Sequence, residues 1–369
     1  MKQKIIPRNT SDSSHGRSRI EKGIFHTINS KKKEETALSR NSNTIMFLQK
    51  IKSAESGVML YGITPPKAGT APERVAEIAQ RTVDRLSSLD IDALVVYDVQ
   101  DESARTTEER PFPFINALDP LAFASEHLGQ LNIPKIIYRP AGKFSPTELT
   151  AWLEELHGRQ FYPVFVGVPA PDFPVKTSLP EAYQIWEKHR DTSVIGAVTI
   201  PERHEVLKDE DVRILDKMNC GVSYFISQCV FNLDYAKQVV EDLYASCQSK
   251  QIAPPTIIFT ITACGSEKTL DFMTWLGIHI PDQLKQELKA AEDMLEKSVG
   301  ICLEIVSQLT AFCLERNIPF GFNIESVAIR KAEIEASIDM ARAIGEILKE
   351  NGLRKPSENL IEQVDPELG

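Results

Sequence analysis

From residue 58 to residue 351 the sequence alternates between short runs of β-branched and aromatic residues and longer runs with helical periodicity. The strand-like runs cover residues 58–63, 93–97, 135–138, 163–166, 193–199, 223–227, 256–261 and 320–324. The helical runs cover residues 72–89, 120–131, 146–156, 179–189, 209–219, 233–251, 281–316 and 331–351. Eight β-then-α units in roughly 300 residues predict an α/β fold, a single-domain (β/α)8 TIM barrel.

A doubly wound open sheet is the alternative fold. Its nucleotide-binding fingerprint, G-x-G-x-x-G after the first strand, is missing from this sequence, which favours the barrel. The seventh connection is the longest, and we expect it to hold two helices divided near Gly277.

The barrel is predicted to occupy residues 46–355, followed by a C-terminal tail at 356–369. Residues 1–45 are rich in Lys, Arg, Ser and Asn with few large apolar residues, which predicts a disordered extension. Two alternatives are a basic tail for nucleic acid and a translation start at Met46. A transit peptide fits less well, because Glu21, Glu34 and Glu35 interrupt the positive charge.

Composition narrows the function classes. The chain is 42% hydrophobic and 25% charged, as soluble globular proteins are, and its net charge of −10 argues against nucleic-acid binding. No apolar run reaches the roughly 18 residues of a membrane span. The six cysteines form no C-x-x-C pair, which predicts reduced thiols in the cytoplasm. No metal-ligand spacing, G-x-S-x-G or phosphate loop is found, which argues against a metal site, a serine hydrolase and a P-loop enzyme.

Barrel enzymes carry their chemistry at the C-terminal ends of the strands, so the strand pattern predicts where the site lies. One strand end is unusual, because GVMLYGITPPK (57–67) has a glycine, Gly62, inside the strand. A glycine there often marks a place where another group approaches the backbone closely. The other predicted site positions are Thr64, 97–101, Arg139, Gly167, Val168, 200–204, Gln228, Thr262, Cys264 and Glu325.

Several polar residues near these ends are candidates. Glu202 and His204 follow the fifth strand at the expected barrel mouth, and His204 is as well explained by function as by a structural role. Gln228 ends the sixth strand, where an amide either recognises a ligand's donors and acceptors or is satisfied by a neighbouring loop backbone. Lys217 lies on a helix and by itself indicates a solvated charge.

The segment from about residue 46 to 350 resembles the methylenetetrahydrofolate reductases. YGITPP (61–66) is similar to the family's first-strand motif, GAVTIPERHE (196–205) to its fifth-strand motif, and LDKMNCGVSYFISQCVFN (215–232) to its Lys-x-x-x-Gly segment and the strand after it. The resemblance implies a (β/α)8 barrel that reduces 5,10-methylenetetrahydrofolate to 5-methyltetrahydrofolate in one-carbon metabolism and methionine biosynthesis. It also implies NAD(P)H as electron donor and FAD as cofactor.

The resemblance implies roles for individual residues. His204 would lie beside the flavin, Lys217 near its ribose-phosphate tail, and Glu210 at an acidic flavin contact. Gln228 would bind the pterin.

The departures from the family are also informative. Gly62 stands where the family has the glutamate that acts as general acid. Val166, Val168 and Ile200 replace polar contacts to flavin and folate. FAD is therefore expected to bind weakly or not at all.

Another residue must then supply the proton. In a closed barrel the eighth strand lies beside the first, and it ends at Glu325, which we expect to reach the space above Gly62. Burial among Phe320, Phe322 and Ile324 would raise its pKa. The alternative role for Glu325 is to cap the next helix, and the next candidate acids are Asp98 and Asp101.

These observations predict a methylenetetrahydrofolate reductase-like oxidoreductase with an altered acid. The alternative is a folate-binding barrel without reductase activity that serves a methyl-transfer partner. A folate substrate, a cytoplasmic location and a homo-oligomer are expected, with no nucleic-acid or membrane partner.

Overall fold

The computed structural model describes residues 46–170, 172–190 and 193–355. The polar extension predicted at 1–45 and the tail predicted at 356–369 lie outside the described residues.

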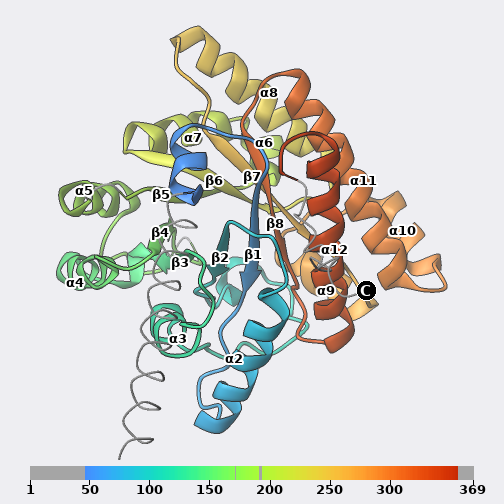
Figure 1. The fold of residues 1–369 in the computed structure, drawn as a ribbon, viewed down its shortest axis with the longest axis horizontal. Helices are drawn as coiled ribbons and strands as arrows, with labels where there is room; N and C mark the ends of the chain where they lie inside the picture. Colours follow the sequence, from blue (N-terminus) through green and yellow to red (C-terminus); the bar gives the residue numbers. More distant parts are fainter. Residues whose placement is uncertain (1–45, 171, 191–192, 356–369) are drawn as a thin grey trace, which may run out of the picture.

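The eight strands are parallel and close into one barrel in the order β1 to β8, with β8 beside β1. Figure 1 shows them at the centre of the molecule with the helices around them. The predicted (β/α)8 barrel is therefore confirmed. The strands are β1 Val58–Ile63, β2 Ala93–Val96, β3 Lys135–Pro140, β4 Phe161–Val166, β5 Ile195–Thr199, β6 Val222–Cys229, β7 Thr256–Thr262 and β8 Phe320–Glu325.

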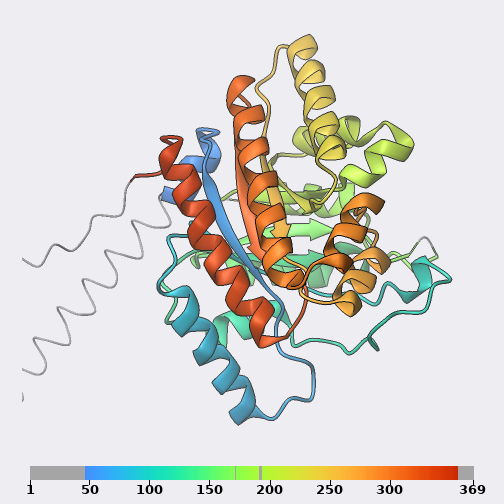
Figure 2. The ribbon, with the colours of Figure 1, turned by 90° about the vertical axis from the view of Figure 1, so that its right-hand side faces the viewer.

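The helices form the outer layer, and several begin with proline at the first position, where its missing N–H costs no hydrogen bond. They are α2 Pro72–Leu86, α3 Pro120–His127, α4 Pro146–Leu156, α5 Leu179–His189, α6 Pro201–Leu207, α7 Glu210–Asn219, α8 Leu233–Lys250, α9 Glu267–Trp275, α10 Asp282–Ala290, α11 Met294–Glu315 and α12 Lys331–Glu350. Two 3-10 turns, Ser103–Arg105 and Ala141–Lys143, follow β2 and β3. The view of Figure 2 shows α11 and α12 lying side by side.

The structure differs from the prediction in the seventh connection. It holds three helices, not two, because the helix predicted at residues 281–316 divides into α10 and α11. The first break is where we expected it, since α9 ends at Trp275 and Gly277 adopts φ +85°, which favours glycine. The second break precedes α11, whose N-terminus Asp293 caps by accepting from the amides of Leu295 and Glu296. Helix α6 was missed.

Alternation along the strands divides the core into two clusters. Phe320, Phe322 and Ile324 of β8 belong to the larger cluster, which includes the buried faces of the surrounding helices. The smaller cluster lies inside the barrel and includes Phe47, from a short helix over residues 46–52. Phe47 is fully buried, with its ring 5.2 Å from that of Tyr162, so the segment beginning at residue 46 is part of the fold.

Helix α11, with 22 residues, is the one described helix long and apolar enough to cross a membrane by length and composition. In this fold it packs against β7, α8 and α12 and buries one face in the outer core. Its apolar character is accounted for by that packing.

Candidate functional site

The barrel mouth, the end of the barrel at which the strands finish, is crowded around Gly62. The strand register places Gly62 opposite Glu325 of β8. A β-carbon at Gly62 would lie 2.8 Å from Cε2 of Tyr97, 2.9 Å from its hydroxyl oxygen and 3.2 Å from Oε2 of Glu325. The close approach predicted for this glycine is confirmed, and the group that approaches is the Tyr97 side chain.

Tyr97 and Glu325 belong to one hydrogen-bonded group. Asn323 Nδ2 donates to the Tyr97 hydroxyl oxygen at 2.8 Å and to Thr260 Oγ1 at 3.2 Å. The Tyr97 hydroxyl in turn bonds to Glu325, and Cys229 Sγ donates to Glu325 Oε1 at 3.2 Å. Because the Tyr97 oxygen accepts from Asn323, the Tyr97 hydroxyl proton is directed to the Glu325 carboxyl group.

This setting gives Glu325 the character of an acid. Burial raises the pKa of Glu325, although the hydrogen bonds from Tyr97 and Cys229 oppose the shift. The expected source of that burial was wrong, because Phe320 and Phe322 belong to the outer core. The polar and aromatic groups inside the barrel surround the carboxyl group instead.

The capping alternative for Glu325 is not what the structure shows. Helix α12 begins at Lys331, and its N-cap is Arg330. Glu325 is the last residue of β8 and bonds within the barrel.

The other candidate acids lie in the loop after β2. Asp98 is partly buried, 3.6 Å from Arg139 Nη1, and burial raises its pKa. Arg139 is closer to Asp119, at 2.8 Å. Hydrogen bonds from the Ser103 side chain and from the Ser103 amide lower the pKa of Asp101. Among the candidate acids, Glu325 is the one whose carboxyl oxygen is among the three atoms nearest to a β-carbon at Gly62, at 3.2 Å.

Gln228 and Glu202 are held by the segment that follows α9. Gln228 Nε2 donates to the Leu276 carbonyl at 3.1 Å. The His279 amide donates to Glu202 Oε1 at 3.3 Å, and burial raises the pKa of Glu202. Gln228 therefore has a loop-backbone partner, which was one of its two predicted roles. This hydrogen bond involves the amide nitrogen of Gln228 and not its oxygen.

The expected place of His204 at the mouth was wrong. Its ring is 1% exposed, with Nε2 2.8 Å from Asp242 Oδ2, and Nδ1 accepts from the Glu210 amide at 3.2 Å. The reason is that the chain after Ile200 forms helix α6, which turns His204 toward α7 and α8.

Glu210 and Lys217 are also bonded within the protein. Glu210 is fully buried, accepts from the Ile200 amide at 3.0 Å and pairs with Arg203 at 3.1 Å. Lys217 Nζ donates to the Val198 carbonyl at 2.7 Å, and burial lowers the pKa of Lys217 to about 8.

This arrangement does not fit a flavin bound through His204, Glu210 and Lys217, because their polar groups already have protein partners. The three flavin contacts implied by the resemblance stay predictions.

Among the described residues, no group of three or more His, Cys, Asp and Glu side chains is placed to hold a metal.

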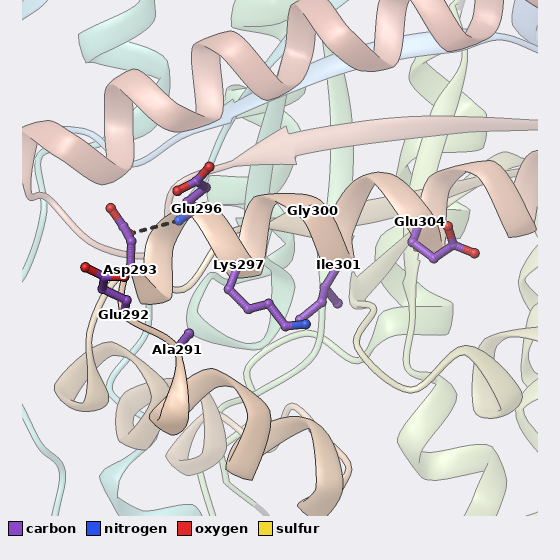
Figure 3. Close-up of a pocket in the computed structure, with 8 residues that line it drawn as sticks. All are labelled: Ala291, Glu292, Asp293, Glu296, Lys297, Gly300, Ile301 and Glu304. Atoms are coloured by element: carbon purple, nitrogen blue, oxygen red, sulfur yellow. Dashed lines mark hydrogen bonds between the residues drawn. The ribbon is translucent and has the colours of Figure 1, made fainter.

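A groove lies apart from the mouth. It is open, has a volume of about 610 Å³, runs beside α11 and is lined by Glu292, Glu296 and Lys297 among others (Figure 3). None of its lining residues is at a strand end, so the groove belongs to the outer helix layer.

The partners of Glu325 were not predicted from the sequence. Asn323 could have been found from the alternation in FGFNIE (320–325), where Gly321, Asn323 and Glu325 share a face opposite the apolar residues. Cys229 had no comparable signal, because the register between β6 and β7 shifts just before it.

The family model described as methylenetetrahydrofolate reductase matches residues 183–319. A solved structure, described as an uncharacterized protein from Clostridium thermocellum that binds two copies of 5-methyl-5,6,7,8-tetrahydrofolic acid, is 44% identical with a TM-score of 0.72. The alignment covers 81% of this chain and 98% of that one.

A more distant likeness is to 2,3-dimethylmalate lyase, 12% identical with a TM-score of 0.42, over 86% of this chain and 90% of that one. A search of curated proteins gave no significant match.

Proposed function

Because the chain belongs to the methylenetetrahydrofolate reductase family, we propose that it reduces 5,10-methylenetetrahydrofolate to 5-methyltetrahydrofolate with NAD(P)H. The observation that carries the proposal is the position of Glu325. This carboxyl group has a raised pKa and adjoins the space that a side chain at Gly62 would enter.

The proposed reaction needs one hydride and one proton. The hydride passes from the nicotinamide to the bridging carbon, which becomes the methyl group on N5. The bond between that carbon and N10 breaks, and the nitrogen takes up the proton. Glu325 supplies this proton, and its raised pKa keeps a larger fraction protonated near neutrality than an ordinary carboxyl would have.

Folate binding is proposed at the same mouth. The Clostridium thermocellum protein is described as binding 5-methyl-5,6,7,8-tetrahydrofolic acid, which is the product of the proposed reaction. In this chain Gln228 has its amide nitrogen held by Leu276, which leaves its oxygen for the pterin. Replacement of Gln228 by leucine should weaken 5-methyltetrahydrofolate binding by about tenfold or more, with thermal stability little changed.

Two experiments test the proposal. Isothermal titration with 5-methyltetrahydrofolate measures binding, and chromatography of anaerobic mixtures with 5,10-methylenetetrahydrofolate and NADH or NADPH measures product. Glu325→Gln should lower the single-turnover rate by about 10²-fold or more with the folate Kd retained. A normal rate in Glu325→Gln would exclude it as the acid and make Asp98→Asn the next variant. Failure of the wild type to bind folate would overturn the proposal.

The second candidate function is a folate-binding barrel that serves a methyl-transfer partner. The internal partners of His204, Glu210 and Lys217 favour it, because each of these residues is already bonded within the protein. Folate binding without turnover, with either nicotinamide and with added FAD, would select this alternative.

A further inference from the structure

Glu202 and Gln228 come from different elements and are anchored by one short segment, residues 276–279. Glu202 is near the start of α6 and bonds to the His279 amide, and Gln228 is in β6 and bonds to the Leu276 carbonyl. His279 is itself fixed, because its Nδ1 lies 3.0 Å from Asn232 Nδ2 and its ring centroid lies 4.9 Å from that of Tyr235.

The anchoring determines which atoms are left for a ligand. A backbone carbonyl only accepts hydrogen bonds, so the Gln228 atom facing Leu276 is the amide nitrogen. Its Oε1 then has no donor among the described residues. Glu202 Oε2 is buried and likewise has no hydrogen-bond partner in the described part of the chain. Two acceptors are therefore left without donors.

These two acceptors lie near the end of the same strand. Both side chains are bonded to the backbone of residues 276–279, which holds the Glu202 carboxylate near the end of β6. A buried carboxylate oxygen without a donor is unfavourable, so a ligand that brings N–H groups to it gains binding free energy.

We infer that Glu202 and Gln228 together form a paired-acceptor edge that binds the 2-amino group and the N3–H of a reduced folate's pterin ring. The inference rests on the proposed folate binding and deepens it by naming the atoms recognised. Glu202 Oε2 and Gln228 Oε1 together supply two acceptors, which match the adjacent N–H donors on the edge of a 2-amino-4-oxopyrimidine. Glu202 is thus a specificity-determining residue for this ring.

The test compares two ligands and two glutamate variants by isothermal titration. The ligands are 5-methyltetrahydrofolate and its 2-desamino-2-methyl analogue, which lacks the amino donors. Glu202→Gln keeps the shape and an acceptor for the His279 amide but replaces the other acceptor with a donor. Glu205→Gln is the matched control, because Glu205 lies on the same helix, is exposed and pairs with Lys208.

In Glu202→Gln the Kd of 5-methyltetrahydrofolate should rise by about tenfold or more. The Kd of the desamino analogue should change much less, since the wild type has already lost the amino contact with it. Glu205→Gln should bind both ligands as the wild type does, and the melting temperatures of all three proteins should agree closely.

An unchanged Kd for 5-methyltetrahydrofolate in Glu202→Gln would overturn the inference. An equal loss of affinity for both ligands would overturn it too, because it would show a structural role for Glu202. Wild-type protein that binds neither ligand would instead remove the proposed function on which the inference rests.

Discussion

Replacing Gly62 with alanine tests the packing of the mouth directly. The added β-carbon would lie 2.8 Å from Tyr97 Cε2 and 2.9 Å from the Tyr97 hydroxyl oxygen, closer than such contacts allow. Tyr97 has little room to move, because its ring centroid is 4.8 Å from that of Tyr138 and its oxygen bonds to Asn323. Overpacking of this kind costs about 1–3 kcal/mol. Loss of the glycine penalty in a strand returns about 0.5–1 kcal/mol, so we expect a net destabilisation of up to roughly 2.5 kcal/mol.

A double-mutant cycle isolates the contact. In a Tyr97→Ala background the obstructing ring is gone, and Gly62→Ala should then stabilise the protein by about 0.5–1 kcal/mol. The expected coupling between the two positions is about 1–3 kcal/mol. The same obstacle meets a glutamate at position 62, so Gly62→Glu should restore a general acid only together with a smaller residue at 97.

Unfolding in urea is monitored by circular dichroism. The m value, which is the slope of the unfolding free energy against urea concentration, is compared between variants before midpoints are converted to free energies. Gly300→Ala is the control. Gly300 lies in α11, and a β-carbon there would meet nothing within 4 Å. This control should be stabilised by up to about 1 kcal/mol. The reasoning would be refuted if Gly62→Ala had the same effect with and without the Tyr97 ring.

Three further predictions follow from the structure. A chain that starts at Met46 should keep its melting temperature and folate affinity, whereas removal of the segment through residue 52 should lower the melting temperature sharply, because Phe47 is fully buried; a large drop on removing residues 1–45 alone would contradict this. Between pH 8 and 10.5 the unfolded chain holds the Lys217 proton and the folded chain releases it, so this group's contribution to the free energy of unfolding should rise with pH by on the order of 3 kcal/mol. The difference in unfolding free energy between Lys217→Met and the wild type should change across that window, and a constant difference would count against the shifted pKa. Purified protein should carry little or no FAD, and a yellow preparation with stoichiometric, tightly held flavin absorbance would contradict that expectation.

Much of the fold was predictable because a closed parallel barrel of β-then-α units determines which strands are neighbours. The apolar run at Val58–Ile63 is β1 as observed, and the β8–β1 neighbourhood that brings Glu325 to Gly62 follows from eight β-then-α units. Helix α6 was missed because a seven-residue helix with four charged or titratable side chains resembles a polar loop in sequence.

The candidate site was predictable only in part. Strand ends could be located, so Gln228, Tyr97 and Glu325 were among the expected positions. The direction of a side chain after a strand ends depends on the next backbone turn, which is why His204 was misplaced. The contact between Tyr97 and Gly62 depends on the stagger of β1 and β2, and the sequence pattern does not specify that stagger.

The most direct test of the proposed reduction follows the hydride itself. The protein is incubated anaerobically with 5,10-methylenetetrahydrofolate and NADH or NADPH carrying deuterium at C4, using each stereoisomer of the label in turn. Mass spectrometry then measures deuterium in the methyl group of the product. We predict 5-methyltetrahydrofolate with one deuterium from one stereoisomer, formed about 10²-fold or more slowly by Glu325→Gln. Protein that binds folate but forms no 5-methyltetrahydrofolate with either donor would contradict the proposed function.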